Sequence, residues 1–292
     1  MTRLRSLLLM APSLLTIGIF MAVPMLVALA YSFMTSSPYG GVQMPFSVGA
    51  YIQILYDEDF DGTLAFTTDY LMIIGRSVVL AGLTTAACLA VAFPTAWFIV
   101  CRAPRQRQLL LFLVSLPFWI NTLIRTYCWV LLLRDEGLVN HLLEGAGVTD
   151  EPVTLLYNDG AILLGLIYTF LPFMVLPIYS TLERVDHRLI EAAYDLYANR
   201  RLVFRRILWP LARPGVAAGA LLVFAPALGS FLAPDLLGGG RKLLIGSLIQ
   251  LEFTSGRNWP FGSAIAVLVS TGVLIAMLIQ ARRGRPPSEL HA

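Results

Sequence analysis

The residues best suited to chemistry lie in one polar segment between two apolar stretches, residues 184–213. Glu191 and Asp195 are four apart, so a helix would place both carboxylates on one face, beside Ala192 and Ala193. Because alanine side chains are small, another surface can approach such a helix closely. The pattern favours docking of a short charged helix into a groove on a soluble partner, with a merely solvated amphipathic loop as the alternative.

The same segment continues into a second short element. Asn199 can cap a helix that begins at Arg200, since an asparagine side chain accepts a hydrogen bond from a free backbone N–H of the first turn. Pro210 and then Pro214 are predicted to break this helix before the next apolar run. The segment is therefore predicted to be a helix–turn–helix on one surface of the protein.

A second group of candidates could line a path for a solute. Its members are polar, charged or aromatic residues in or beside apolar runs: Trp119, Asn121, Arg125, Tyr127 and Asp235. An arginine within an apolar span costs about 2.5–3.5 kcal/mol on insertion scales. Arg125, like Arg76, either snorkels or pairs inside the protein, or faces the pathway. Asp235, beside three glycines, either caps a short helix or lies at the external mouth.

The elements that carry these residues are apolar. Of the 292 residues, 57% are hydrophobic and only 13% are charged, with a mean hydropathy of +0.73; soluble proteins carry roughly 25% charged residues. A helix needs roughly 20 apolar residues to cross a membrane, and the sequence holds six apolar runs near this length. The prediction is therefore an all-α integral membrane protein with one transmembrane domain over residues 1–292. The predicted spans are 7–33, 71–100, 109–133, 161–179, 216–232 and 263–279.

Arginine placement predicts the orientation. Residues 34–69 contain no Lys or Arg but hold an acidic run, whereas residues 184–213 are rich in arginine and the C-terminus has Arg282, Arg283 and Arg285. Basic loops stay on the cytoplasmic side. Both termini and residues 184–213 are therefore predicted to be cytoplasmic, although the predicted external loop 233–261 deviates with three basic residues. The acidic run comprises Asp57, Glu58, Asp59 and Asp61.

Other chemistries find little support in the sequence. The three cysteines show no metal-ligand spacing and are predicted to be buried free thiols, and the three histidines are scattered, so no metal site is predicted. The sequence has no Gly-x-x-x-x-Gly-Lys-Ser/Thr phosphate loop. The net charge of the chain is only +3. The chain is expected to lie in a lipid bilayer, and no nucleic-acid partner is expected.

The polar segment resembles the coupling-loop signature of ABC importer permeases. Glu191-Ala192-Ala193, Ile207 and Pro210 stand at the family spacing. Tyr197 stands where the family has Gly, and Trp209 where it has Leu. If that Gly adopts a positive φ, a tyrosine there would cost about 1 kcal/mol or more. The residues that the resemblance assigns to ATPase coupling are Glu191, Ala192, Ala193, Asp195, Tyr197 and Ala198.

Further motifs resemble the spermidine/putrescine-type permeases. They cover most of residues 113–262 and are carried by residues 117–127, 137–140, 234–240 and 258–262. The resemblance implies a six-helix permease bundle in the bacterial inner membrane that has no enzymatic site and no cofactor of its own. It also implies three kinds of protein partner: a second similar permease, two ATPase subunits that bind the ATP, and a periplasmic solute-binding protein.

The solute implied is a polyamine such as putrescine or spermidine, and the acid-rich external side would also attract cations. Opines, thiamine and sulfate remain alternatives, because similar permeases import them. A stand-alone secondary transporter is a further alternative, but such proteins use ionisable groups within their spans, and the predicted spans contain almost no acid. A membrane enzyme would need a cluster such as histidine with acids, which the sequence does not show.

Overall fold

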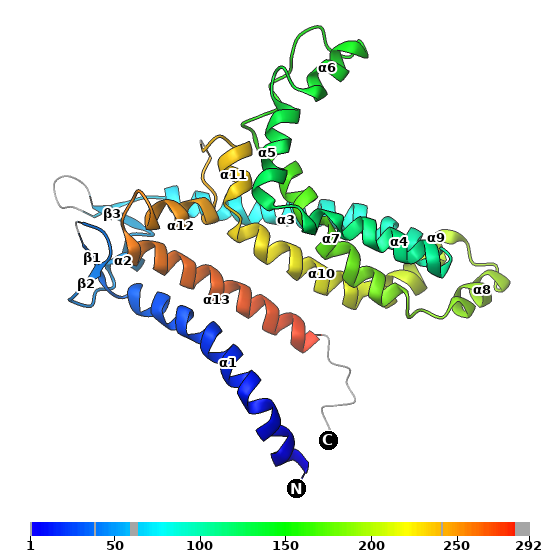
Figure 1. Ribbon diagram of the computed structural model, residues 1–292, viewed down its shortest axis with the longest axis horizontal. Coiled ribbons are helices and arrows are strands. Elements are labelled where there is room, and N and C mark those ends of the chain that lie inside the picture. Colours follow the sequence, from blue (N-terminus) through cyan, green and yellow to red (C-terminus); the bar gives the residue numbers. More distant parts are fainter. Residues whose placement is uncertain (1, 38, 59–63, 241, 284–292) are drawn as a thin grey trace. The chain divides into compact units, whose positions relative to one another are not determined.

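The computed structural model describes residues 2–37, 39–58, 64–240 and 242–283, and over these residues it is mainly helical (Figure 1). Internal contacts divide the chain into two compact units. Unit 1 is Met1–Met72 with Leu248–Ala276, and unit 2 is Ile73–Ser247 with Met277–Ala292. Four residues used in the sequence argument lie outside the described residues: Asp59, Asp61, Arg241 and Arg285.

Long apolar helices dominate the described chain. Five are long and apolar enough to cross a membrane: Ala11–Tyr31, Asp69–Val100, Asp159–Leu182, Arg200–Gly229 and Trp259–Gln280. A bent pair, Pro104–Trp119 with Thr122–Gly145, makes a sixth if it is counted as one span. The predicted all-α membrane protein with six transmembrane helices is confirmed at this level.

Unit 1 combines two apolar helices with a small irregular segment. Tyr31 at the end of α1 packs near Trp259 at the start of α13, with ring centroids 6.3 Å apart. The amide nitrogen of Asn258 donates to Gln53 Oε1 over 3.1 Å, which ties residues 49–53 to the same helix start. The elements of unit 1 that precede the long helix α3 (Asp69–Val100) are α1 (Thr2–Tyr31), β1 (Thr35–Ser36), β2 (Val42–Gln43), α2 (Gly49–Ile52), β3 (Tyr56–Glu58) and β4 (Leu64–Phe66).

The strands form two antiparallel pairs. β1 pairs with β2 with Thr35 opposite Gln43, and β3 pairs with β4 with Tyr56 opposite Phe66. The rings of Tyr56 and Phe66 meet edge to face at 5.8 Å, a cross-strand contact of the kind that stabilises short hairpins. Near the C-terminal side of the unit, α12 (Ile245–Phe253) precedes α13 (Trp259–Arg283).

Unit 2 is built around α7 (Asp159–Leu182), which packs against α10 (Trp209–Gly229). Met174, Ile178 and Leu182 of α7 have no exposed surface. Small residues allow the two helices to approach closely. A Cβ on Gly215 would lie 2.5 Å from the Pro177 carbonyl oxygen, and one on Gly219 would lie 3.3 Å from the Met174 backbone. Such glycines are typical of helix contacts in membranes.

The predicted span 109–133 is divided in the structure. It falls on α4 (Pro104–Ser115), a 3-10 turn η1 (Leu116–Trp119) and α5 (Thr122–Leu133). The segments Pro104–Trp119 and Thr122–Gly145 meet at 91°. Pro117 cannot donate a helical hydrogen bond, and Ile120 is extended. Asn121 then starts a new helix by accepting the Leu123 N–H at 2.8 Å. Beyond α5, the chain continues into α6 (Leu138–Gly145).

The fifth span begins and ends earlier than the predicted 216–232. Its helical run comprises α9 (Arg200–Val203), a π-helical segment η2 (Phe204–Leu208) and α10. The break predicted at Pro210 and Pro214 is wrong, because the helix passes through both prolines. Pro210 lies in the first turn of α10, directly after the π-helical segment, where a missing backbone N–H costs least. The helix ends at Ser230, before α11 (Leu232–Leu237).

Short polar side chains begin several helices of unit 2. Asn158 caps α7 by accepting the Ala161 N–H at 2.9 Å, and Asp186 caps α8 (His187–Asp195) by accepting the Arg188 N–H at 3.0 Å. Asn199 accepts the Leu202 N–H at 2.9 Å, so the prediction that it caps the second helix of the polar segment is confirmed. These caps explain why the chain turns sharply at these points.

Candidate translocation pocket and coupling loop

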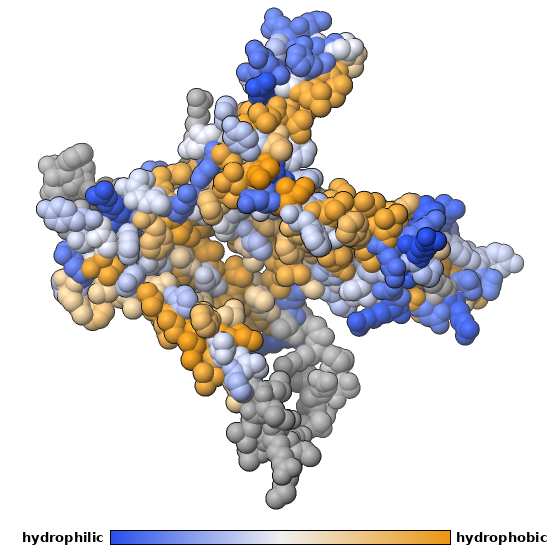
Figure 2. All heavy atoms as spheres, in the orientation of Figure 1, coloured by the Kyte–Doolittle hydropathy of each residue, from blue (hydrophilic) through white to orange (hydrophobic). Residues whose placement is uncertain are grey.

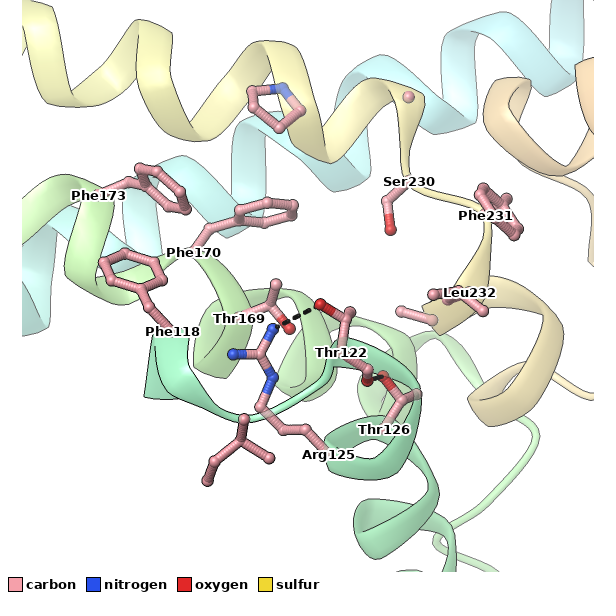
Figure 3. Close-up of a pocket in the computed structure, with 14 residues that line it drawn as sticks. Phe118, Thr122, Arg125, Thr126, Thr169, Phe170, Phe173, Ser230, Phe231 and Leu232 are labelled. Carbon is pink, nitrogen blue, oxygen red and sulfur yellow. Dashed lines mark hydrogen bonds between the residues drawn. The ribbon is translucent and has the colours of Figure 1, made fainter. Parts of the chain in front are cut away.

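A pocket of about 370 Å³ lies within unit 2, among η1, α5, α7, α10 and α11 (Figure 3). Phe118, Phe170 and Phe173 form one wall, with Phe118 and Phe173 in edge-to-face contact at 4.6 Å. Ser230, Phe231 and Leu232 lie on the other side, where α10 gives way to α11. The remaining lining residues are Ile120, Thr122, Arg125, Thr126, Thr169, Pro226, Gly229 and Ala233.

Arg125 brings a positive charge to this pocket. It is only 6% exposed, and it donates from one terminal nitrogen to the Pro117 carbonyl at 2.7 Å and from the other to Thr122 Oγ1 at 3.4 Å. Its guanidinium lies 5.7 Å from the centre of the Tyr168 ring. Its Nε has no hydrogen-bond partner among the described residues. Because no carboxylate lines the pocket, the charge is uncompensated there.

The structure brings only one of the five predicted pathway residues into this pocket. Arg125 lines it, whereas Trp119 and Tyr127 are 79% and 53% exposed outside its lining. Asn121 is used as the cap of α5. Asp235 lies in the first turn of α11, and the N-cap of that helix is Phe231. Of the two roles considered for Asp235, the helix cap is therefore wrong. The assignment of the pathway stays a prediction.

Sequence reasoning missed most of the lining. The phenylalanines of α7 look like ordinary apolar span residues, and Thr169 and Ser230 are single hydroxyls within apolar runs. Ser230 was the one signal in the sequence that could have been used. It is a polar residue inside an apolar run, and the structure shows that α10 ends there and α11 begins just after it. Which side of each helix faces the pocket follows from the packing of α7 and α11. Gly165 of α7 lies against Leu237 of α11, whose side chain would have to shift to make room for a Cβ there.

The second predicted arginine is paired. Arg76 of α3 donates to Asp159 at the start of α7, and Lys242 approaches the other carboxylate oxygen of Asp159 at 3.4 Å. This contact supports the structural interpretation of Arg76. It also gives Lys242, one of the basic residues that deviated from the orientation pattern, an acidic partner.

A hydrogen-bonded cluster anchors the end of α7 close to the coupling segment. Arg107 of α4 donates to Glu183 Oε1 at 3.1 Å and to the Val100 carbonyl at 2.8 Å. The Tyr179 hydroxyl donates to the same Glu183 oxygen at 2.6 Å. The hydrogen bond from Tyr179, followed by that from Arg107, lowers the pKa of Glu183 below its ordinary value. Glu183 thus stays ionised and joins the end of α7 to Arg107 of α4, which in turn binds the Val100 carbonyl at the end of α3.

The cysteines do not form a site. Among the described residues, no three His, Cys, Asp or Glu side chains come together to hold a metal. Cys88 is buried and its thiol donates to the Ile167 carbonyl over 3.7 Å. The prediction of buried thiols is wrong for Cys101 and Cys128, which are exposed in the chain on its own because they lie beside or on outward-facing helix surfaces.

The predicted coupling residues lie together on α8 and the turn after it, at one end of unit 2 (Figure 1). Hydrophilic residues gather over this end in Figure 2, while apolar residues cover the neighbouring part of α4. Leu189 of α8 and Leu196, the residue that caps the end of this helix, are 51% and 81% exposed, and Ala192 between them is exposed too. Their spacing of three and four places them on one helix face. This face is apolar and exposed, and the small side chain of Ala192 lies at its centre.

The remaining coupling residues frame that face. Glu191 and Asp195 are exposed, whereas Ala193 and Ala198 are half-buried. The Ala198 N–H donates to the Ala193 carbonyl at 3.0 Å, and the Tyr197 N–H donates to the Tyr194 carbonyl at 2.9 Å. These two bonds form a Schellman motif, which closes a helix with one residue in the left-handed region.

That left-handed residue is Tyr197. It has a φ of 57° and is 98% exposed. A non-glycine residue in this region costs about 1 kcal/mol or more, because its Cβ crowds the backbone. The chain therefore keeps the turn although Tyr197 stands where the family has Gly. Tyr197 adopts the left-handed conformation that glycine adopts most readily.

Replacing Tyr197 with glycine is expected to strengthen the end of α8. The glycine removes the Cβ crowding, so opening of the last turn should become less favourable by about 1 kcal/mol, or roughly fivefold. Amide hydrogen exchange of residues 195–198 in the purified full chain measures this. Tyr197→Ala is the matched control, since alanine keeps the Cβ. Equal protection in the two variants would contradict the strain assigned to Tyr197.

Taken together, the fold and the site define a class of protein, a multi-pass membrane subunit with a surface-exposed helical loop. Comparison with known families agrees. Residues 3–284 match the model of the family described as "Binding-protein-dependent transport system inner membrane component". The chain belongs to this family, and the resemblance to ABC importer permeases seen in its motifs is confirmed. It is accordingly a multi-pass protein of the inner membrane.

Individual relatives and solved structures narrow the comparison. The chain is 40% identical to the spermidine/putrescine transport system permease protein PotB of Haemophilus influenzae, over 89% of this chain and 86% of that protein. It is 38% identical to PotB of Escherichia coli K12, over 91% and 93% of the two chains. A bacterial alginate ABC transporter solved with its periplasmic protein shares the fold, with a TM-score of 0.74, 18% identity and coverage of 97% and 93%.

Proposed function

We propose that this chain is one permease subunit of an ATP-driven importer of polyamines, with putrescine and spermidine as the first candidates. The observation that carries the proposal is the 38–40% identity to PotB permeases over about nine-tenths of the chain. The motifs at residues 117–127 and 234–240 support the same solute class. In this proposal the chain forms half of the translocation path and hydrolyses no ATP itself.

The proposed assembly has four kinds of component. A second, similar permease completes the path, two ATPase subunits bind and hydrolyse ATP, and a periplasmic binding protein delivers the solute. The exposed apolar face of α8 supports docking into an ATPase subunit, since an unpartnered small-sided helix suits a groove. ATP-driven closure of the ATPases would then shift the bundle between two states by rigid-body movement.

The proposed orientation follows from the arginines. Both chain termini and residues 184–213 face the cytoplasm, and residues 34–69 face outward, since basic segments are retained inside. This orientation puts α8 on the side where ATP is available.

An anionic or carboxylate-bearing solute is a second candidate, and Arg125 is the observation that favours it. The arginine is almost fully buried, lines the pocket and meets no carboxylate there. A fixed positive charge in such surroundings attracts an anion and repels an ammonium group by a few kcal/mol at contact distances. Sulfate is the inorganic example among the alternatives that the sequence left open.

The expected result is that putrescine and spermidine stimulate ATP hydrolysis by the complete complex in lipid nanodiscs with its own binding protein present. The amines are supplied as chloride salts and sulfate as its sodium salt, so that counter-ions do not confuse the comparison. The matched control omits the binding protein, because delivery of the solute requires it. Stimulation by sulfate, with none by either polyamine, would reject the polyamine assignment and leave the importer function standing.

A further inference from the structure

A basic and aromatic pocket lies at the start of α10. It has a volume of about 390 Å³ and is lined by Phe204, Arg205, Trp209 and Arg213. The residues come from η2 and α10, which form one helical run. Arg205, Trp209 and Arg213 are spaced four apart, and the wider turn of the π-helical segment keeps residues with this spacing close to one face. The run therefore presents an arginine, a tryptophan and an arginine in a single stripe.

The aromatic part of the pocket belongs to a packed cluster of rings. The rings of Phe93, Phe204 and Trp209 form a cluster with centroid separations of 5.2 Å, 5.9 Å and 6.2 Å. Phe93 belongs to α3, so the cluster also packs η2 and α10 against that helix. Tryptophan and phenylalanine grouped in this way offer an apolar wall beside the charged groups.

The two arginines have no acidic partner in the part of the chain that the structure describes. Both are exposed, and neither takes part in the salt bridges found there, which involve Arg76, Arg107, His141 and Lys242. The sequence also contains no Asp or Glu between Asp195 and Asp235. The local charge is thus strongly positive and uncompensated.

The position of the stripe along the helix indicates which part of a membrane the two arginines contact. After Arg213, the helix runs to Gly229 without a charged residue, so the arginines precede the charge-free part of the span. At that depth a membrane presents lipid phosphates, and tryptophan prefers the same interfacial zone. Arginine binds phosphate oxygens with two parallel N–H donors.

From this geometry we infer that Phe204, Arg205, Trp209 and Arg213 form a binding site for the headgroup of an anionic phospholipid, with the phosphodiester held by the two arginines. The lipid's glycerol and upper acyl region lie against the aromatic cluster. The site is separate from the solute pocket and is independent of the solute that the importer carries. It would hold a lipid beside α9 and α10, the run that follows the coupling helix.

Native mass spectrometry of the purified full chain, titrated with phosphatidylglycerol or phosphatidylcholine, tests this site. The wild-type chain is expected to prefer phosphatidylglycerol. The double variant Arg205→Gln/Arg213→Gln should lose affinity for it roughly thirtyfold, which is about 2 kcal/mol. Each single variant should lose about fivefold, so that the test stands even if the double variant does not fold. The matched control is Arg102→Gln/Arg105→Gln, which removes the same charge from the turn before α4 and from its first turn.

The other outcomes would overturn the inference. An equal loss in the control pair would mean that net charge, not this site, attracts the lipid. No preference of the wild-type chain for phosphatidylglycerol would exclude the site directly. Competition by inorganic phosphate at equal concentration would show a simple phosphate site. Unchanged lipid binding in the variants, together with loss of the ATPase subunit from the co-expressed complex, would assign the stripe to that protein partner.

Discussion

Replacing Ala192 with aspartate is expected to abolish transport while the chain still folds and inserts. Ala192 is exposed on α8, so the change should disturb nothing within this chain. In the proposed complex the same surface lies in a groove of an ATPase subunit, and an unpaired carboxylate buried there costs about 3 kcal/mol or more. That loss weakens association more than a hundredfold. Solute uptake and co-purification of the ATPase subunit measure the effect.

The matched control for Ala192→Asp is Ala146→Asp. Ala146 is also exposed, but it follows α6 and lies outside the coupling loop. Because the same charge is added to the same residue type, general effects of the substitution should appear in both variants. Normal uptake and normal ATPase association in Ala192→Asp would argue against docking at this face. The half-buried Ala193 is a less clean position, since aspartate there would also meet its own chain.

Replacing Gly215 with alanine is expected to lower the stability of the purified protein by about 1–3 kcal/mol, which corresponds to a melting temperature several degrees lower. A Cβ at this position would lie 2.5 Å from the Pro177 carbonyl oxygen and 3.1 Å from the Ile178 Cα. Both are backbone atoms of α7, so they cannot move without shifting the helix. Since α7 and α10 form the centre of unit 2, their separation should also reduce transport.

Gly82→Ala provides the control for this second substitution. Gly82 also lies within a long apolar helix, α3, but apart from that helix's own nearby backbone and the two adjacent residues, no heavy atom lies within 4 Å of the position that its Cβ would take. Alanine favours the helix over glycine by about 1 kcal/mol, so the melting temperature should stay the same or rise. If both variants melt at the same temperature, the close contact between α7 and α10 is not what stabilises the unit.

The predicted coupling loop shows how much of the structure local sequence predicts. Asp186 and Asn199 cap their helices as their residue types predict, because capping depends on atoms within three residues of chain. The same locality explains Tyr197, whose left-handed conformation follows from the Schellman turn. Pro210 is the counter-example. Its effect depended on the π-helical segment before it, which sequence periodicity does not reveal.

The sequence by itself determined the membrane class, the approximate span positions and the family, and it located the polar helical loop that is predicted to couple to the ATPase. These features depend on apolar length and on residues close together in the chain, both of which are local properties. Only the tertiary structure decided that Arg125 enters a pocket, that Arg76 pairs with Asp159 83 residues away, and that the third span bends by 91°. The physical reason is that these spans are apolar on all sides, so the packing of α7 against its neighbours, and not hydrophobic periodicity, selects the face that each side chain occupies.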